Sequence, residues 1–278
     1  HVLRSMPADS VDLVMTSPPY EDARTYQDGM PEGKRFRLRG QDWVDWMAPR
    51  VVEMARVCRG LVCINMSSVC RKWSYTATVE WLVADLTRVH GLICGPSPYA
   101  WIKGTGIPGS GHKHYHRRDW EPVYCFIQPG KLPLKWSNNL AFGAPPKHDV
   151  GGRMSLRDRY GDRGDRHGDR ADGPNRGKMG RLGGDGQPEI ANPGNVILAE
   201  VGGWKIGSKR AHDSEAPFPE DLVRRFVAWY CPPKGTVLDP FSGSGTTAAV
   251  AIHEGRKAIA IDIRPSQIAI TKQRCSQV

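Results

Sequence analysis

The sequence predicts an α/β fold in which a mostly parallel sheet is covered by helices on both faces. Short apolar runs, typical of buried strands, alternate along the chain with segments whose apolar residues recur at helical spacing. Strands that alternate with amphipathic helices are typical of a parallel sheet with helices on either side. With 278 residues, 39% of them hydrophobic, the chain is long enough to bury one good core and to carry a smaller appended lobe.

The first half of the chain opens with a strand and a long helix. An apolar run at residues 11–15 predicts the strand. The helix is predicted from apolar side chains at helical spacing, namely Trp43, Val44, Met47, Val51, Met54 and Ala55. Asp42 is placed to cap this helix, and Pro49 is expected to kink or split it because proline lacks the backbone N–H of a helical residue.

The elements that follow complete this half of the sheet. Residues 61–66 predict a buried strand, and residues 79–89 predict a helix. Residues 99–103 and 122–127 predict two further strands, joined by a connection rich in glycine and histidine. We expect these two strands to form an antiparallel hairpin at one edge of the sheet.

The second half repeats the pattern after an interruption. Helices are predicted at 222–229 and 246–253, with Gly255 as a stop, and strands at 236–238 and 257–263. Residues 1–130 and 211–278 therefore form the predicted main domain, with residues 131–210 inserted into it.

The inserted region has a different composition from the rest of the chain. Periodicity fades there, and residues 155–186 are dense in Gly, Arg and Asp. The region fits either a solvated, mobile loop or an arginine-bearing arm that becomes ordered on a phosphate backbone.

Net charge and cysteine content narrow the class of protein. Lys and Arg exceed Asp and Glu by 39 to 29, so the surface should attract polyanions, although solubility alone would also explain the excess. No apolar run is long enough to cross a bilayer, and no cleavable signal segment is evident. The cysteines, seven in number and without C-x-x-C spacing, fit reduced thiols, so we expect a cytosolic protein.

Residues 235–263 predict a cofactor-binding turn. The first strand there ends at Asp239, and Gly243 and Gly245 let the backbone approach a ligand before a helix opens at Thr246. The next strand ends near Asp262, roughly 20 residues on, where a dinucleotide-binding fold places the carboxylate that binds ribose hydroxyls. The glycine spacing matches neither G-x-G-x-x-G nor G-x-x-x-x-G-K-[ST], which counts against nicotinamide, flavin and ATP-hydrolysing enzymes.

Together, "TSPPY" at residues 16–20 and "DPFSGSGTT" at residues 239–247 resemble the amino-group DNA methyltransferases, which make N4-methylcytosine or N6-methyladenine. Because the catalytic motif comes first and the cofactor loop last, the order resembles the permuted beta group of that family. The segment at residues 212–230 resembles the lead-in to the cofactor pocket of that group. The region at 131–210 matches no motif, but its position resembles that of a target-recognition region.

This resemblance implies a Rossmann-like methyltransferase sheet, S-adenosylmethionine as cofactor and double-stranded DNA as partner. It further implies that the protein is a monomer or homodimer and needs no metal. The resemblance also implies a cytoplasmic protein of bacterial, archaeal or phage origin. The implied catalytic residues are Ser17, Pro18, Pro19 and Tyr20. The implied cofactor-binding residues are Thr16, Asp239, Pro240, Phe241, Ser242, Gly243, Gly245, Thr246 and Asp262.

In the arrangement implied by the family, the Ser17 side chain and the Pro18 carbonyl accept hydrogen bonds from the target amino group, and Tyr20 stacks on the flipped base. No covalent intermediate is required, and none of the cysteines follows a proline. Ser17 resembles the N4-cytosine enzymes, whereas the adenine enzymes more often carry Asp, so we predict N4-cytosine methylation. N6-adenine methylation, methylation of RNA or a protein amide, and a non-catalytic nucleic-acid-binding module remain as alternatives.

Other candidates rest on weaker patterns. Basic residues expected to contact DNA phosphates are Lys113, Arg117, Arg118, Arg153 and Arg157. His112, His114 and His116 alternate as a strand-borne metal site would, but we expect a basic loop there and no metal. Glu21 and Asp22 are near enough to receive a proton and are expected to be solvated, while Asn65 with Ser67 and Ser68 is expected to line the cofactor pocket.

Overall fold

The computed structural model describes most of the chain outside the predicted insertion. The described residues are 2–21, 38–71, 74–95, 97–103, 119–131, 194–199 and 219–278. The chain divides into two units, His1–Trp136 with Asn195–Val278 and Ser137–Gly194, and apart from Gly194 all described residues belong to the first unit. The boundaries predicted for the insertion stay a prediction.

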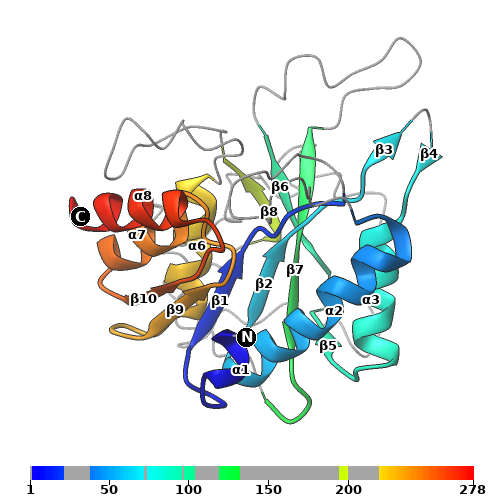
Figure 1. Cartoon of the computed structure of the whole chain (residues 1–278), viewed down its shortest axis with the longest axis horizontal. Helices are drawn as coiled ribbons and strands as arrows, with labels where there is room; N and C mark the ends of the chain where they lie inside the picture. The colour runs from blue at the N-terminus through cyan, green and yellow to red at the C-terminus, as the bar shows by residue number, and fades with distance from the viewer. Residues whose placement is uncertain are drawn as a thin grey trace, which may run out of the picture. The chain divides into compact units, whose positions relative to one another are not determined.

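One eight-stranded sheet organises the first unit, in the order β10-β9-β1-β2-β7-β6-β8 with β5 also paired to β7 (Figure 1). Its strands are β1 (Leu13–Thr16), β2 (Val62–Asn65), β5 (Ile93–Cys94), β6 (Tyr99–Ile102), β7 (Trp120–Ile127), β8 (Val196–Leu198), β9 (Thr236–Asp239) and β10 (Lys257–Ala260). Strands β10, β9, β1 and β2 run parallel, and β7 is antiparallel to β2, β5 and β6. The predicted α/β class with a mostly parallel sheet is confirmed, and β6 and β7 are antiparallel to each other as predicted. The predicted edge position of this hairpin is wrong, because β8 pairs with β6 on its outer side.

Several short elements were not predicted. Strand β8 lies within the range 131–210 but pairs in parallel with β6, so part of that range belongs to the main sheet. Strands β3 (Cys70–Arg71) and β4 (Ser74–Tyr75) form a separate two-stranded sheet. These pairings, and that of β5 with β7, each join two or three pairs of residues, which is too short for periodicity to reveal them.

The helices are α1 (Val2–Ser5), α2 (Gly40–Val57), α3 (Thr78–Arg88), α6 (Glu220–Tyr230), α7 (Thr246–His253) and α8 (Pro265–Cys275). The prediction that Asp42 caps α2 is wrong, because the helix begins at Gly40 and Asp42 lies in its first turn. Pro49 does not split α2, which runs through it as one helix. Helix α8 was missed, although Pro265 at its start is a known opening signal.

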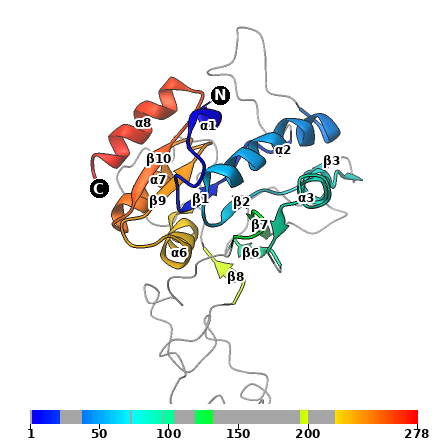
Figure 2. The same ribbon diagram turned by 90° about the horizontal axis from the view of Figure 1, so that it is seen from below.

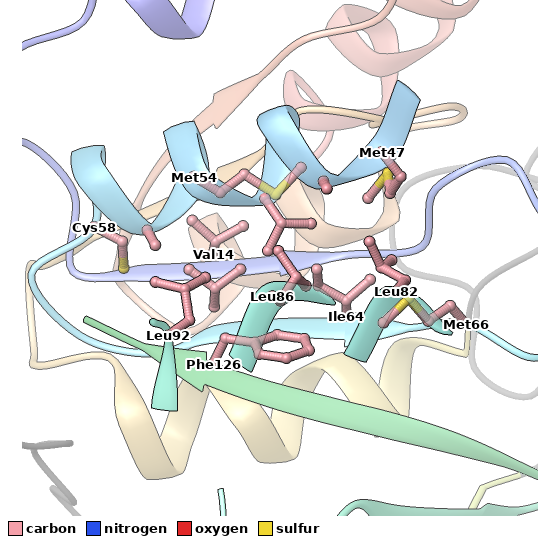
Figure 3. Packing of buried hydrophobic residues seen from close by; sticks show 14 of the residues in the cluster. Val14, Met47, Met54, Cys58, Ile64, Met66, Leu82, Leu86, Leu92 and Phe126 are labelled. Carbon is pink, nitrogen blue, oxygen red and sulfur yellow. The ribbon is translucent and has the colours of Figure 1, made fainter. Parts of the chain in front are cut away.

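Two apolar clusters show that helices cover both faces of the sheet. In β1, Val14 points to the cluster shared with α2 and α3, whereas Leu13 and Met15 point to the cluster shared with α6 and α7. Figure 3 shows the first cluster, where Met47 and Met54 of α2 lie over Val14 and Ile64 of the strands. Figure 2 shows α2 and α6 on opposite sides of the sheet.

Within the described residues, no helix is both long and apolar enough to span a membrane.

The strand order predicts a ligand crevice between β1 and β9. The chain passes from β1 through α2 to β2 on one side, and from β9 through α7 to β10 on the other. The strand order therefore reverses between β1 and β9, at the topological switch point of the sheet, here called the point of reversal. In open α/β sheets, ligands bind at this point, beyond the carboxyl ends of the strands. Because β7 is antiparallel, its first residues lie at the same edge as the last residues of β1, β2 and β6.

Candidate active site

The ends of β1 and β9 are joined by a buried hydrogen bond at the point of reversal. Thr16 Oγ1 donates to Asp239 Oδ1 over 2.6 Å, and the Phe241 N–H donates to the same oxygen over 3.1 Å. Burial nevertheless raises the pKa of Asp239 to about 6, and the nearby Asp262 charge contributes in the same direction. The "TSPPY" segment and the "DPFSGSGTT" segment, far apart in sequence, are therefore in direct contact.

The turn after β9 has the open backbone expected of a ligand-binding loop. Gly243 and Gly245 have φ values of +48° and +78°, which residues with a Cβ rarely adopt. A Cβ at Gly243 would meet nothing within 4 Å, whereas one at Gly245 would lie 2.7 Å from Thr271 Oγ1 and Cγ2. Gly245 thus allows α8 to pack closely, and Gly243 borders free space. Ser242 Oγ is buried and finds no hydrogen-bond partner among the described residues.

Asp262 follows β10 and is bound to this turn. Its Oδ2 accepts from the Gly243 N–H over 2.8 Å, and its Oδ1 accepts from Arg264 through the backbone N–H at 2.9 Å and Nε at 3.1 Å. The carboxylate therefore fixes the position of the glycine turn. The predicted contact with a ribose stays a prediction.

Helix α8 holds the turn from outside and was not found from the sequence. Thr271 Oγ1 donates to the Gly243 carbonyl over 3.1 Å. Arg274, 1% exposed, donates from Nη1 to Thr246 Oγ1 over 2.9 Å and from Nη2 to the buried Glu220 of α6. Pro265 could have revealed the helix, but no sequence pattern indicates that Arg274 pairs with a carboxylate 54 residues earlier.

The Ser-Pro-Pro-Tyr segment crosses from β1 toward β2. Pro18 is buried and Ser17 half-buried, and Trp43 Nε1 of α2 donates to the Pro19 carbonyl over 3.1 Å. The Tyr20 hydroxyl donates to Glu121 Oε2 over 2.9 Å and accepts from Asn65 Nδ2 over 2.8 Å. The structure thus brings all four predicted catalytic residues to the edge where Asp239 lies.

Near this segment, Glu21 has a different environment from the predicted one, and Ser68 makes a structural contact that was not predicted. Glu21 is buried, not solvated: it accepts from the Gly40 N–H at the start of α2 and from Thr78 Oγ1, over 2.9 Å and 2.7 Å. It is therefore committed to joining α2 and α3. Ser68 Oγ accepts from the Val79 N–H over 2.9 Å and so stabilises the start of α3.

The remaining candidates lie outside the described residues. These are Asp22, His112, Lys113, His114, His116, Arg117, Arg118, Arg153 and Arg157. Within the described ranges, no group of three or more His, Cys, Asp or Glu side chains could hold a metal ion.

Comparison with known proteins identifies the family. A family model described as "DNA methylase", for N6 and N4 methyltransferases, matches residues 11–273. The chain belongs to this family, which confirms the resemblance drawn from the two motifs. The DNA adenine methyltransferase YhdJ of Escherichia coli K12 is 26% identical over 280 residues, a match that covers 98% of this chain and 78% of that protein.

Solved structures confirm the fold. The cytosine-N4-specific PvuII DNA methyltransferase superposes with a TM-score of 0.67 at 18% identity, covering 98% of this chain and 82% of that one. A putative DNA modification methylase of Thermus thermophilus, TTHA0409, solved with S-adenosyl-L-methionine, gives 0.52 at 22% identity, covering 99% and 89%. The sheet is thus a Rossmann-like methyltransferase sheet. The relatives include an adenine enzyme and the structural neighbours a cytosine enzyme, so the family membership leaves the target base open.

Proposed function

We propose that this protein transfers the methyl group of S-adenosylmethionine to the exocyclic N4 of a cytosine in DNA. The observation that carries the proposal is the 2.6 Å hydrogen bond between Thr16 and Asp239, because it joins an acceptor-bearing Ser-Pro-Pro-Tyr segment to a glycine turn at the point of reversal.

The glycine turn and its surroundings fit the cofactor. Free space beside Gly243 accommodates a ligand close to the backbone, and the buried Ser242 hydroxyl offers hydrogen bonds that no described residue uses. Asp239, whose carboxylate accepts from the Phe241 N–H of the same turn, supplies a negative charge once it ionises, which favours a cationic ligand. When bound, S-adenosylmethionine supplies an electrophilic methyl group on a sulfonium. The Asp262 side chain would contact the ribose.

The Ser-Pro-Pro-Tyr segment supplies what an exocyclic amino group needs in order to react. The lone pair of that nitrogen is delocalised into the base, so the amino group must be oriented by acceptors for its N–H bonds. The Ser17 side chain and the Pro18 carbonyl are such acceptors, and the two prolines fix the backbone that carries them. Their rigidity means that little reorganisation is needed in the transition state.

Tyr20 would hold the target base outside the helix. A base inside a duplex cannot reach a crevice at a sheet edge, so the nucleotide has to rotate out of the stack. Rotation out of the duplex loses base stacking and base pairing. Stacking on an aromatic ring is worth about 1–3 kcal/mol per base and offsets part of this cost. The excess of basic residues, 39 against 29 acidic, favours binding to the phosphate backbone.

Ser17 favours cytosine over adenine in this proposal. Adenine N6 is the second candidate, since the same acceptors would serve its amino group and the relative YhdJ is an adenine methyltransferase. Neither the acceptors nor the cofactor turn would change between the two.

A substrate panel tests the class of reaction. Purified protein with methyl-labelled S-adenosylmethionine is offered duplex DNA, RNA or a protein mixture, and the label in each is measured. Label in DNA alone is expected. Label in RNA or protein alone would contradict the proposal, and so would cofactor binding with no transfer to any substrate.

A further inference from the structure

A buried polar network outside the Ser-Pro-Pro-Tyr segment fixes the Tyr20 hydroxyl. Its other members are Asn65 at the end of β2, Glu121 of β7 and Lys103 after β6. Glu121 Oε2 accepts from Tyr20 over 2.9 Å and from Asn65 Nδ2 over 3.0 Å, while Glu121 Oε1 accepts from Lys103 Nζ. Tyr20 is therefore connected to β2 and β7 directly, and through Glu121 to the residue that follows β6.

The charged pair in this network is well shielded from water. The side chains of Lys103 and Glu121 are 6% and 13% exposed, and Lys103 Nζ lies 4.9 Å from the centre of the Trp101 ring. Charged groups are rarely buried to this extent unless they are paired. Such a buried ion pair contributes little net stability to the fold, because well-packed apolar side chains in its place often stabilise a protein as much. Its placement against Tyr20, to which the proposed function assigns contact with the target base, calls for a different explanation.

The hairpin that carries the pair is held by backbone pairing at this point. Trp101 pairs with Glu121 and Ile102 with Trp120, and the Lys103 N–H donates to the Asp119 carbonyl over 2.8 Å. Glu121 is thus held by the pairing of β6 with β7, and Lys103 by a backbone hydrogen bond just beyond the ends of these strands. Glu121 offers Tyr20 an acceptor whose position is set by the sheet, whereas Tyr20 itself lies in an irregular segment.

We infer that Glu121, with Lys103, is a positioning residue that holds the Tyr20 ring at the orientation in which it stacks on the flipped base. The inference rests on the proposed function. A hydrogen bond from the hydroxyl to a charged acceptor is stronger than one to a neutral acceptor, and it restricts rotation of the ring from its far end. Glu121 thereby affects methyl transfer through Tyr20, without touching cofactor or substrate.

The test compares two matched substitutions. Glu121→Gln keeps the shape of the side chain and removes its charge. Glu254→Gln makes the same change in a control carboxylate, whose side chain is also 13% exposed and forms a salt bridge with Arg224. Glu254 directly follows α7, at the end of that helix opposite the glycine turn. Each is made in the unaltered chain and in Tyr20→Phe. Steady-state methylation of duplex DNA, cofactor affinity and thermal unfolding are measured for every variant.

We expect Glu121→Gln to lower kcat about tenfold, equivalent to about 1.4 kcal/mol, with cofactor affinity unchanged. In the Tyr20→Phe background the same substitution should change kcat less than about twofold, because the hydroxyl through which it acts is absent. Glu254→Gln should change kcat less than about twofold in both backgrounds.

Each contrary result has a distinct meaning. An equal loss of kcat in both backgrounds would overturn the inference, because Glu121 would then act independently of Tyr20. A loss that follows thermal unfolding would overturn it in favour of a structural role. If Glu121→Gln unfolds, Lys103→Met combined with Glu121→Gln removes both charges and is tested in its place. If the unaltered chain puts no label into DNA, the proposed function itself is overturned. If it does label DNA but the effects of Glu121→Gln and Tyr20→Phe on kcat are independent of each other, this inference alone is overturned.

Discussion

Replacing Asp239 with asparagine removes its charge and keeps its shape. The side-chain oxygen of the introduced amide would still accept from Thr16 and from the Phe241 N–H, so the hydrogen bonds at the point of reversal survive. The carboxylate it replaces has a pKa of about 6 in the folded protein, against 3.8 as the usual value, chiefly because burial disfavours its charged form. The substitution therefore isolates the free energy of burying this charge.

The sign of the effect follows from proton binding. Between pH 3.8 and about 6 the folded state holds more protons at Asp239 than the unfolded state, so stability falls as the pH rises through that window. The two pKa values differ by about 2, which at about 1.4 kcal/mol per unit gives about 3 kcal/mol in full. About 1.4 kcal/mol of this is lost between about pH 5 and pH 8.

Urea unfolding of both proteins at about pH 5 and pH 8 measures this loss. The free energy of unfolding of Asp239→Asn, relative to that of the unaltered chain, should rise by about 1.4 kcal/mol between these two pH values. The other titrating groups are common to both proteins, so their contributions cancel in this difference. The affinity of the unaltered chain for S-adenosylmethionine should rise over the same range, and that of the variant should stay low. Parallel pH profiles of stability would refute the assignment of a buried, charge-bearing Asp239 at the crevice.

The other predictions concern the rest of the site. Ser17→Ala should keep cofactor affinity, measured by calorimetry, and lose most turnover, because the acceptor it removes acts in the transition state; equal losses in both would place Ser17 in the cofactor pocket. Gly245→Ala should lower the free energy of unfolding by about 1–3 kcal/mol, because its Cβ would lie 2.7 Å from Thr271 Oγ1 at a φ of +78°. Gly243→Ala carries the strain of a φ of +48° but its Cβ would meet nothing within 4 Å, so it should destabilise the fold less than Gly245→Ala and reduce cofactor affinity more; the reverse order of effects would contradict the placement of the ligand. Asp262→Ala should weaken cofactor binding, both by losing the predicted ribose contact and by releasing the Gly243 N–H; unchanged affinity would defeat that assignment.

The strands and helices with strong periodicity were predictable because each pattern spans several residues. The helix predicted at 246–253 has the bounds observed for α7, and the strand predicted at 61–66 contains β2. Strand β8 has three residues within a region of faded periodicity, and its pairing with β6 depends on the sheet rather than on local sequence. Helix α8 buries only Thr271 and Arg274, so it has almost no apolar face to detect.

The candidate site was predictable where motifs define it, and not where distant side chains meet. The contact between Thr16 and Asp239 follows from parallel neighbours whose carboxyl ends share an edge. Glu21 was expected to be solvated because adjacent carboxylates after a turn usually are, and burial against Gly40 and Thr78 depends on how two helices pack. The pairing of Lys103 with Glu121 depends on the register of the hairpin, which the sequence does not specify.

The identity of the methylated nucleoside tests the proposed function most directly. The protein is incubated with methyl-labelled S-adenosylmethionine and mixed-sequence duplex DNA, the DNA is digested to nucleosides, and the labelled product is identified by mass. We expect the label in N4-methylcytosine. Label in N6-methyladenine would keep the chemistry and contradict the choice of base drawn from Ser17, and DNA without label would contradict the central claim.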